Sequence, residues 1–334
     1  MRGVPVKRSG RGRVALLALL AATAVLAPAA PAAQAEYRMA GAFGHPGSGP
    51  GAFGPPRADF RTYRLLTSPG GIAFAGGQVL VSDPLNSRIQ RFSADGRFLG
   101  AFGRKGVRPG EFLSPQGLVV HAGKVFVAMN GNDRVDVFSL RGRWLRMFHV
   151  RSNVRRTHAM ARGAGRGQLH NPYGIARAAG GRFFVADLLN ARIQRFDGRG
   201  VSRGQIGRFG RGPGEFLAPY GVAVDPGGNL WASDRDLNRV QRFAPDGRLL
   251  LSVGETGDGP GDFLSPQGVA TDRLGNVYVA DTNNRRVVKL APDGSFLESF
   301  GEGVLAQPVQ LAVSPDCTVW VSDYRRVVKF AGGC

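Results

Sequence analysis

The sequence predicts an all-β fold, a six-bladed β-propeller that closes into a ring. Three observations predict this fold. A motif of proline, a variable residue, glycine and two apolar residues recurs with glycine spacings of 46, 57, 47 and 47 residues. Each copy precedes β-rich runs separated by turn residues, and no segment shows helical periodicity. Finally, residues 37–44 resemble a fourth strand that the last repeat lacks.

The first 35 residues have the pattern of a secretory signal peptide. Basic residues precede an apolar stretch over 14–27, and Ala33-Gln34-Ala35 has the small residues of a cleavage site. The apolar stretch is shorter than the ~20 residues that a membrane span requires. We therefore expect a secreted or extracytoplasmic protein, cleaved near Ala35, with a domain over 36–334 and no membrane span.

Six repeats divide the domain. The motif stands at Pro69, Pro115, Pro172, Pro219, Pro266 and, in degenerate form, Pro308. We expect blades near 68–103, 114–148, 171–207, 218–254, 265–301 and 306–334. The interval of 57 residues indicates an insertion between the second and third repeats.

Each repeat predicts four antiparallel strands. The motif begins the first strand, the second ends in Asp, an Arg begins the third, and an Asp-Gly or similar turn leads to the fourth. The last repeat stops after its third strand at Cys334. We expect residues 37–44 to complete this blade, because closure of the ring removes unpaired strand edges.

The combined pattern resembles the NHL repeat. The resemblance rests on Pro-x-Gly-Ile/Val, an apolar strand that ends in Asp, and Asn-x-Arg-Ile/Val with Phe, and it extends over residues 37–334. It implies a six-bladed propeller. It does not imply one function, because function depends on the sites that a particular propeller carries.

The recurring Asp and Arg of each repeat are best explained by turn structure. An Asp at a strand end can accept hydrogen bonds from backbone N–H groups of the turn and face the Arg that begins the next strand. We assign this structural role, rather than a metal or catalytic role, to Asp83, Arg88, Asp187, Arg192, Asp234, Arg239, Asp281, Arg286, Asp323 and Arg326. Met129 replaces the Asp in the second repeat, which predicts a weaker turn there.

The two cysteines, Cys317 and Cys334, are expected to form a disulfide. Both lie in the last repeat of a chain predicted to reach an oxidising compartment. The bridge would stabilise the closing blade by about 3 kcal/mol in the loop-entropy model.

One residue per repeat, between the proline and the glycine, is expected near the mouth of the central channel. Aromatic and amide side chains there would suit a sugar or a peptide, although they could equally fill the channel and bind backbone groups. The candidate ligand-binding residues are Gln116, Tyr173, Tyr220, Gln267 and Gln310, with Val309 as an alternative to Gln310.

The chain is strongly basic, with a formal net charge of +20. Part of the excess of basic over acidic residues lies in the insertion, at Arg151, Arg155, Arg156, Arg162 and Arg166. Such a run is either a solvated loop or a docking site for an anionic surface. Export disfavours a cellular RNA target, so nucleic acid is a less favoured partner, although it is not excluded.

The candidate residues favour recognition over catalysis. The five histidines fall at unrelated repeat positions. Lyases of the peptidyl-hydroxyglycine type need several inward histidines for zinc, and lactonase-like propellers need acidic ligands at the mouth. We therefore expect no metal or cofactor and a secreted, non-catalytic scaffold that binds an extracellular protein, peptide or cell-envelope polysaccharide. A metal-dependent lyase or hydrolase, and binding of nucleic acid or another anionic polymer through a basic face, remain alternatives.

Overall fold

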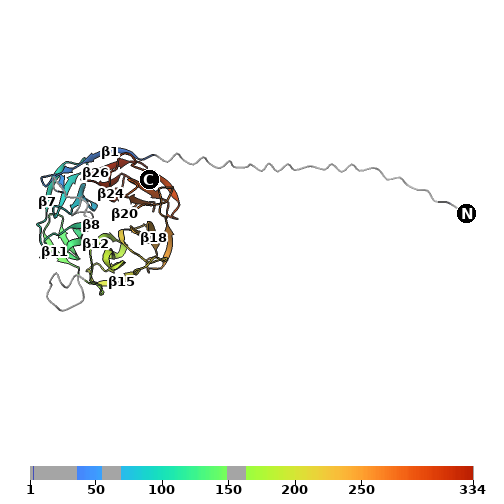
Figure 1. Cartoon of the computed structure of the whole chain (residues 1–334), viewed down its shortest axis with the longest axis horizontal. Helices are drawn as coiled ribbons and strands as arrows, with labels where there is room; N and C mark the ends of the chain where they lie inside the picture. Colours follow the sequence, from blue (N-terminus) through green and yellow to red (C-terminus); the bar gives the residue numbers. More distant parts are fainter. Residues whose placement is uncertain (1–2, 4–35, 55–68, 149–162, 334) are drawn as a thin grey trace. The chain divides into compact units, whose positions relative to one another are not determined.

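The computed structural model describes residues 3, 36–54, 69–148 and 163–333 (Figure 1). The expected signal peptide, apart from Gly3, lies outside these residues, and export stays a prediction. Among the described residues, no helix is long and apolar enough to cross a membrane.

Six four-stranded antiparallel sheets form the described part of the domain. Blade 1 contains β4 (Ile72–Ala75), β5 (Gln78–Asp83), β6 (Arg88–Ser93) and β7 (Phe98–Phe102). Blade 2 contains β8 (Pro115–His121), β9 (Lys124–Met129), β10 (Arg134–Ser139) and β11 (Trp144–Met147). Blade 3 contains β12 (Pro172–Arg177), β13 (Phe183–Asp187), β14 (Arg192–Phe196) and β15 (Ser202–Ile206).

The remaining blades repeat this order. Blade 4 contains β16 (Pro219–Val224), β17 (Leu230–Asp234), β18 (Arg239–Phe243) and β19 (Leu249–Val253). Blade 5 contains β20 (Pro266–Thr271), β21 (Val277–Asp281), β22 (Arg286–Leu290) and β23 (Phe296–Phe300). Blade 6 contains β24 (Pro308–Val313), β25 (Val319–Asp323), β26 (Arg326–Ala331) and β1 (Arg38–Phe43). The short elements are β2 (His45–Pro46), β3 (Ala52–Phe53) and the 3-10 turns η1 (Asn130–Asn132), η2 (Ala179–Gly181) and η3 (Leu188–Asn190).

The N-terminal strand closes the ring. Strand β1 pairs antiparallel with β26, so that Arg38 faces Ala331 and Phe43 faces Val327, and the two strands lie side by side in Figure 1. Tyr37, just before β1, stacks on Phe300 of the preceding blade with ring centroids 4.4 Å apart. The predicted all-β, six-bladed fold and its closure by the N-terminal segment are therefore confirmed.

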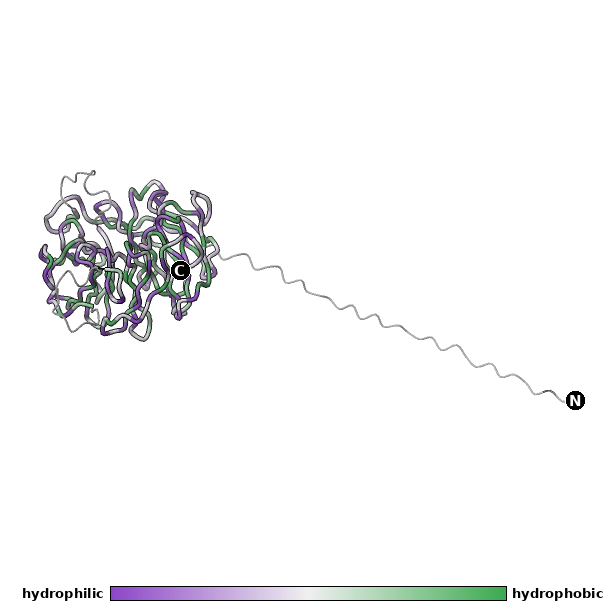
Figure 2. The backbone as a smooth tube through the Cα atoms, turned by 60° about the horizontal axis from the view of Figure 1, so that its bottom comes forward, coloured by the Kyte–Doolittle hydropathy of each residue, from purple (hydrophilic) through white to green (hydrophobic). Residues whose placement is uncertain are grey.

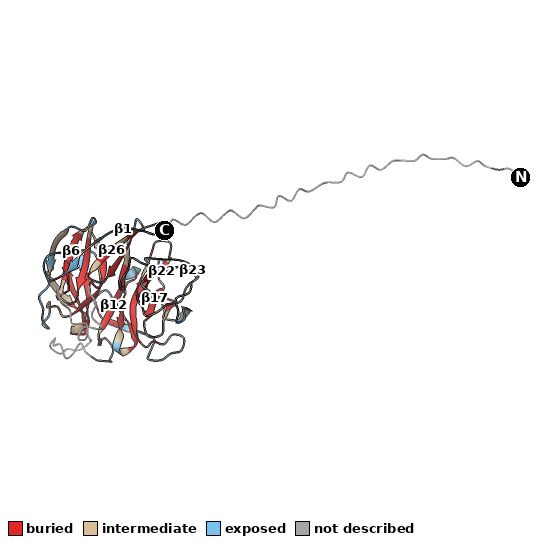
Figure 3. Ribbon diagram, turned by 45° about the horizontal axis from the view of Figure 1, so that its top comes forward, coloured by how far each residue is buried: buried red, intermediate tan, exposed pale blue. Residues whose placement is uncertain are grey.

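The hydrophobic core lies between neighbouring blades. Phe184 and Val222, from blades 3 and 4, belong to one buried cluster, and Tyr278 and Val328, from blades 5 and 6, belong to another. Hydrophobic and hydrophilic stretches alternate along the backbone tube in Figure 2, and strands such as β12 and β17 are buried along most of their length in Figure 3. Each blade therefore buries its sheet faces against its neighbours.

The glycine of the repeat motif allows the innermost strands to approach one another. A Cβ added at Gly221 would lie 2.2 Å from the carbonyl oxygen of Gln267, and one at Gly174 would lie 2.5 Å from that of Tyr220. Equivalent contacts occur at Gly71, Gly117 and Gly268. A side chain at these positions would strike the backbone of the next blade, which explains why the motif repeats glycine.

Candidate functional site

The domain has two faces with different loops. We call the side with the loops that precede each first strand and those that join second to third strands the loop face. We call the opposite side, with the tight turns that join first to second and third to fourth strands, the turn face. The loops before the first strands include segments 45–54, 104–112, 163–169, 208–216, 255–263 and 301–306, which we call the rim loops.

The repeat Asp and Arg hold the rim loops in place. In blade 3, the Asp187 carboxylate accepts hydrogen bonds from the His170 backbone N–H at 2.7 Å, Asn190 Nδ2 at 2.9 Å and Arg192 Nε at 2.7 Å. Arg192 Nη2 in turn donates to two carbonyl oxygens of rim loop 163–169. The carboxylate therefore orients the guanidinium, and the guanidinium fixes the loop backbone.

In the other five blades, too, an arginine binds the rim-loop backbone. A repeat arginine donates to a rim-loop carbonyl oxygen in each of them, at Arg88, Arg134, Arg239, Arg286 and Arg326. The Nε of Arg88, Arg286 and Arg326 also donates to Asp83, Asp281 and Asp323, respectively. The paired carboxylates are buried, and the purely structural role of these residues stays a prediction.

Blades 2 and 4 depart from this pattern. In blade 2, Met129 is fully buried at the usual Asp position, and Asp136 accepts the hydrogen bond from Arg134 Nε at 2.9 Å. The expectation of a weaker turn took no account of this second carboxylate. In blade 4, Asp234 accepts hydrogen bonds from backbone N–H groups, while Arg239 Nε has no partner among the described residues.

Burial is the largest influence on the pKa of four of these buried Asp side chains. Desolvation raises the pKa of Asp136, Asp187, Asp234 and Asp281 above the ordinary value, although neighbouring arginines and N–H donors act in the opposite direction. The groups face rim-loop backbone rather than an open cleft.

The two tyrosines and the three glutamines proposed at the channel mouth are buried. Tyr173 and Tyr220 are 2% and 3% exposed, and their ring centroids lie 4.3 Å apart. Tyr220 Oη accepts a hydrogen bond from Arg235 Nη1 at 2.6 Å, and this guanidinium covers the ring. Gln116 is 0% exposed and Gln267 is 8% exposed. Ligand binding by these side chains stays a prediction.

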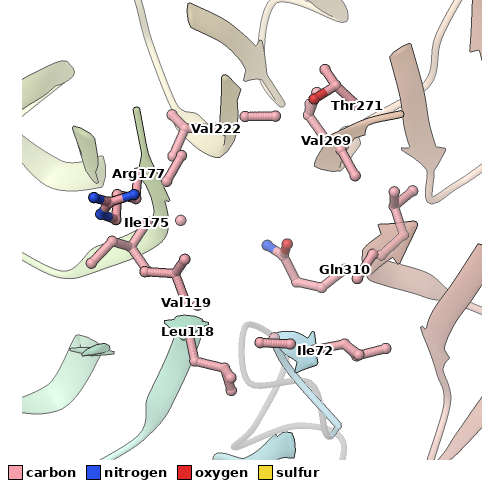
Figure 4. Close-up of a pocket in the computed structure, with 18 of the residues that line it drawn as sticks. Ile72, Leu118, Val119, Ile175, Arg177, Val222, Val269, Thr271 and Gln310 are labelled. Atoms are coloured by element: carbon pink, nitrogen blue, oxygen red, sulfur yellow. The ribbon is translucent and has the colours of Figure 1, made fainter. Parts of the chain in front are cut away.

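The central channel consists of stacked layers of inner-strand residues. The cavity has a volume of about 290 Å³. Its first layer includes the motif glycines Gly71, Gly117 and Gly174. Gln310 occupies the glycine position of blade 6 and points into the cavity (Figure 4). The next layer is entirely apolar, with Ile72, Leu118, Ile175, Val222, Val269 and Leu311. In the sequence, Gln310 was visible only as a departure from the repeat motif in the sixth copy.

The proposed basic loop falls mostly outside the described residues. Arg151, Arg155, Arg156 and Arg162 lie there, so their role as a docking site stays a prediction. Arg166 is exposed on rim loop 163–169, and its Nη2 donates to the carbonyl oxygen of Ser202 at 3.3 Å.

The predicted disulfide also stays a prediction. Cys317 is buried in the turn before β25, whereas Cys334 lies outside the described residues.

Exposed residues on the rim loops were missed by sequence reasoning. Phe209 is 75% exposed, and exposed cations lie on rim loops of blades 2, 3 and 4. We call this set the basic rim; it comprises Lys105, Arg108, Arg166, Phe209 and Arg211. An alignment of the rim loops within the sequence could have found it, because Thr256 and Asp258 stand in blade 5 at the positions of Phe209 and Arg211 in blade 4.

The described residues provide no metal cluster of the usual kind. Among them, no group of three or more His, Cys, Asp or Glu side chains could hold a metal ion. His45 and His121 are exposed at separate places on the domain, and His149 and His158 lie outside the described residues.

Comparison with solved structures supports the fold. A gluconolactonase from Xanthomonas campestris is 16% identical with a TM-score of 0.62, over 92% of this chain and 99% of the other. Virginiamycin B lyase from Staphylococcus aureus is 13% identical with a TM-score of 0.54, over 79% and 95%. A chain of a nidogen/laminin complex is 18% identical with a TM-score of 0.55, over 74% and 84%. These identities establish a shared fold alone.

The fold and its repeated turns thus define a closed six-bladed β-propeller. No curated protein sequence matches the chain. The NHL repeat model matches residues 263–290, from the rim loop of blade 5 to the end of β22. This match and the six blades support an NHL-repeat propeller family.

Proposed function

We propose that the domain is a secreted, non-catalytic recognition scaffold that binds an extracellular protein, peptide or cell-envelope polysaccharide through its loop face. The observation that carries the proposal is the fixed backbone of the rim loops. Buried Asp and Arg side chains hold these loops, while the exposed residues differ from blade to blade. A rigid scaffold with variable exposed side chains is suited to binding a macromolecule.

The basic rim indicates the chemistry of the partner. Phe209 offers a large exposed ring, and Arg211 and Arg108 are exposed cations within the rim loops of blades 4 and 2. Aromatic and arginine side chains are enriched among the residues that contribute most to binding. We therefore favour an acidic protein surface or an anionic wall polymer.

A capture experiment tests this proposal. The mature domain would be crosslinked to intact cells and to isolated envelope, beside the variant Phe209→Ser with Arg211→Ser. A matched control, Arg248→Ser with Leu250→Ser, removes one cation and one exposed apolar residue near and on the outer strand β19. We expect capture to be lost in the first variant and kept in the control. Equal capture by all three proteins would contradict the proposal.

The enzymatic alternative makes a different prediction. The similar lyase and gluconolactonase share the fold at low identity, and a metal-dependent lyase or hydrolase should retain stoichiometric zinc or calcium. Metal analysis after purification without chelator therefore separates this alternative from a scaffold.

Binding of nucleic acid or another anionic polymer through a basic face should weaken steeply with salt, because binding releases counterions. Titration with DNA and with anionic wall polymer at several salt concentrations would distinguish these ligands.

A further inference from the structure

The channel opens on the turn face into a second cavity. This cleft has a volume of about 480 Å³ and shares Arg177, Val224, Thr271 and Val313 with the channel, so the two spaces adjoin. The shared residues belong to the innermost strands of blades 3 to 6. The channel and the cleft therefore form one path from Gln310 to the turn face.

Arg177 is the one charged side chain in its layer of the channel. The equivalent residues in the other blades are Phe74, Val120, Val224, Thr271 and Val313. Arg177 Nε is buried and has no hydrogen-bond partner among the described residues, and no ion pair forms at this side chain within them. An unpaired cation beside apolar walls favours an anionic group of a ligand.

Gln310 gives a second, independent indication. Its side chain is 8% exposed and points into the channel, and its Nε2 also lacks a partner among the described residues (Figure 4). Arg177 Nε and Gln310 Nε2 are N–H donors without a partner among the described residues, and most of the side chains that line the channel are aliphatic. A ligand that fits must therefore accept hydrogen bonds and carry an apolar body.

The acidic residues of the cleft are already engaged. Asp225 pairs with Arg242 at 2.8 Å, and Asp272 accepts hydrogen bonds from Asn276 and from Tyr278 Oη. Arg177 and the exposed Arg273 add further positive charge to the same cleft. The cleft lining thus contains two cations, Arg177 and Arg273, beside two carboxylates that are bound to other partners.

We propose that this path binds a carboxylate carried on a short aliphatic chain. Arg177 binds the carboxylate where the channel meets the cleft, and the chain lies in the channel against Ile175, Val222 and Val269. This site is on the opposite side from the basic rim. It therefore does not depend on the recognition function proposed above.

Calorimetric titration with octanoate tests the proposal. The wild-type domain should bind one octanoate, octylamine should not bind, and acetate should bind at least tenfold more weakly than octanoate. Arg177→Met should lower the octanoate affinity at least tenfold, and Arg177→Lys should restore part of it. Arg182→Met is the matched control, because Arg182 is exposed in the neighbouring turn and lines neither cavity.

Thermal unfolding of each variant shows whether it is folded. If Arg177→Met does not fold, Gln310→Phe provides a second test, since a ring in the channel should exclude octanoate but leave acetate binding unchanged. Absence of octanoate binding to the wild-type domain would overturn the proposal. Unchanged octanoate affinity in a folded Arg177→Met variant would overturn it as well.

Discussion

Asp136 and Arg134 form a buried ion pair at 2.9 Å in the one blade that lacks the repeat Asp. The side chains are 0% and 3% exposed. Arg134 also donates to the rim loop of its blade, as the arginines of other blades do. The carboxylate has therefore changed position along the strands, from the end of β9 to the third residue of β10, while the contact it supports has been kept.

Removal of this carboxylate should be costly. We expect Asp136→Ala to lower the free energy of unfolding by about 3 to 5 kcal/mol, because Arg134 would remain buried without its charged partner. Chemical denaturation provides the measurement. The double variant Met129→Asp with Asp136→Gln recreates the arrangement of blade 3 and should recover most of the loss. A double variant as unstable as Asp136→Ala would show that the two positions are not equivalent.

The motif glycines should tolerate no side chain. We expect Gly221→Ala to lower the free energy of unfolding by about 3 kcal/mol, since its Cβ would lie 2.2 Å from the Gln267 carbonyl oxygen. Gly49→Ala is the control, because nothing lies within 4 Å of a Cβ there. Thermal or urea unfolding measures both. Equal effects of the two substitutions would contradict the close packing of inner strands.

Alkaline pH should destabilise the closing blade. Burial raises the pKa of both Tyr37 and Tyr278, whose hydroxyl oxygens lie 2.9 Å apart. The unfolded tyrosines ionise near pH 10, so their stabilising contribution is complete below about pH 10 and is lost as the pH rises toward the folded-state values. The variant Tyr37→Phe with Tyr278→Phe should lose less stability than the wild type between pH 8 and pH 11. A steeper loss in the variant would refute this cause.

Deletion of residues 36–44 should open the ring. The outer edge of β26 would lose its partner strand, and unpaired edges promote association between chains. We expect a lower midpoint of thermal unfolding and aggregation visible by light scattering. A peptide with the sequence of residues 36–44 should restore the monomer, whereas a scrambled peptide should not. A monomeric deletion variant with unchanged stability would argue against closure by β1.

The proposed disulfide can be tested directly. Intact mass should be two hydrogens below the reduced mass if Cys317 and Cys334 pair. Cys334→Ser should then lower the free energy of unfolding by about 3 kcal/mol, and reductant should have a similar effect on the wild type only. Reactivity of both thiols in the folded, untreated protein would disprove the bridge.

The fold was predictable because its determinants repeat. Each blade needs the motif glycine, a strand ending in a polar residue and the turn before the third strand, so six similar copies define the architecture. The same logic predicted the place of residues 37–44, since one blade lacked a strand. A short motif that would predict little by itself predicts a blade when it recurs six times.

The candidate sites were less predictable because they depend on departures from the repeat. Gln310 stands where the other repeats have the motif glycine, so in the sequence it indicated only a degenerate motif. Arg177 stands at a position where the repeats share no residue type. Burial of Tyr173 and Tyr220 follows from contact between neighbouring blades and from Arg235, which lies on another loop. Such contacts join residues whose sequence spacing says nothing about their proximity.

Pairing of β1 with β26 joins residues about as far apart as this chain allows, for example Arg38 and Ala331. Contacts of long sequence separation slow folding, because the entropy of loop closure is lost before the contact forms. The last blade cannot assemble during synthesis until residues near 330 have been added. A nascent domain should therefore remain incomplete and sensitive to proteases until nearly all of its sequence is available, and then become resistant in one late step.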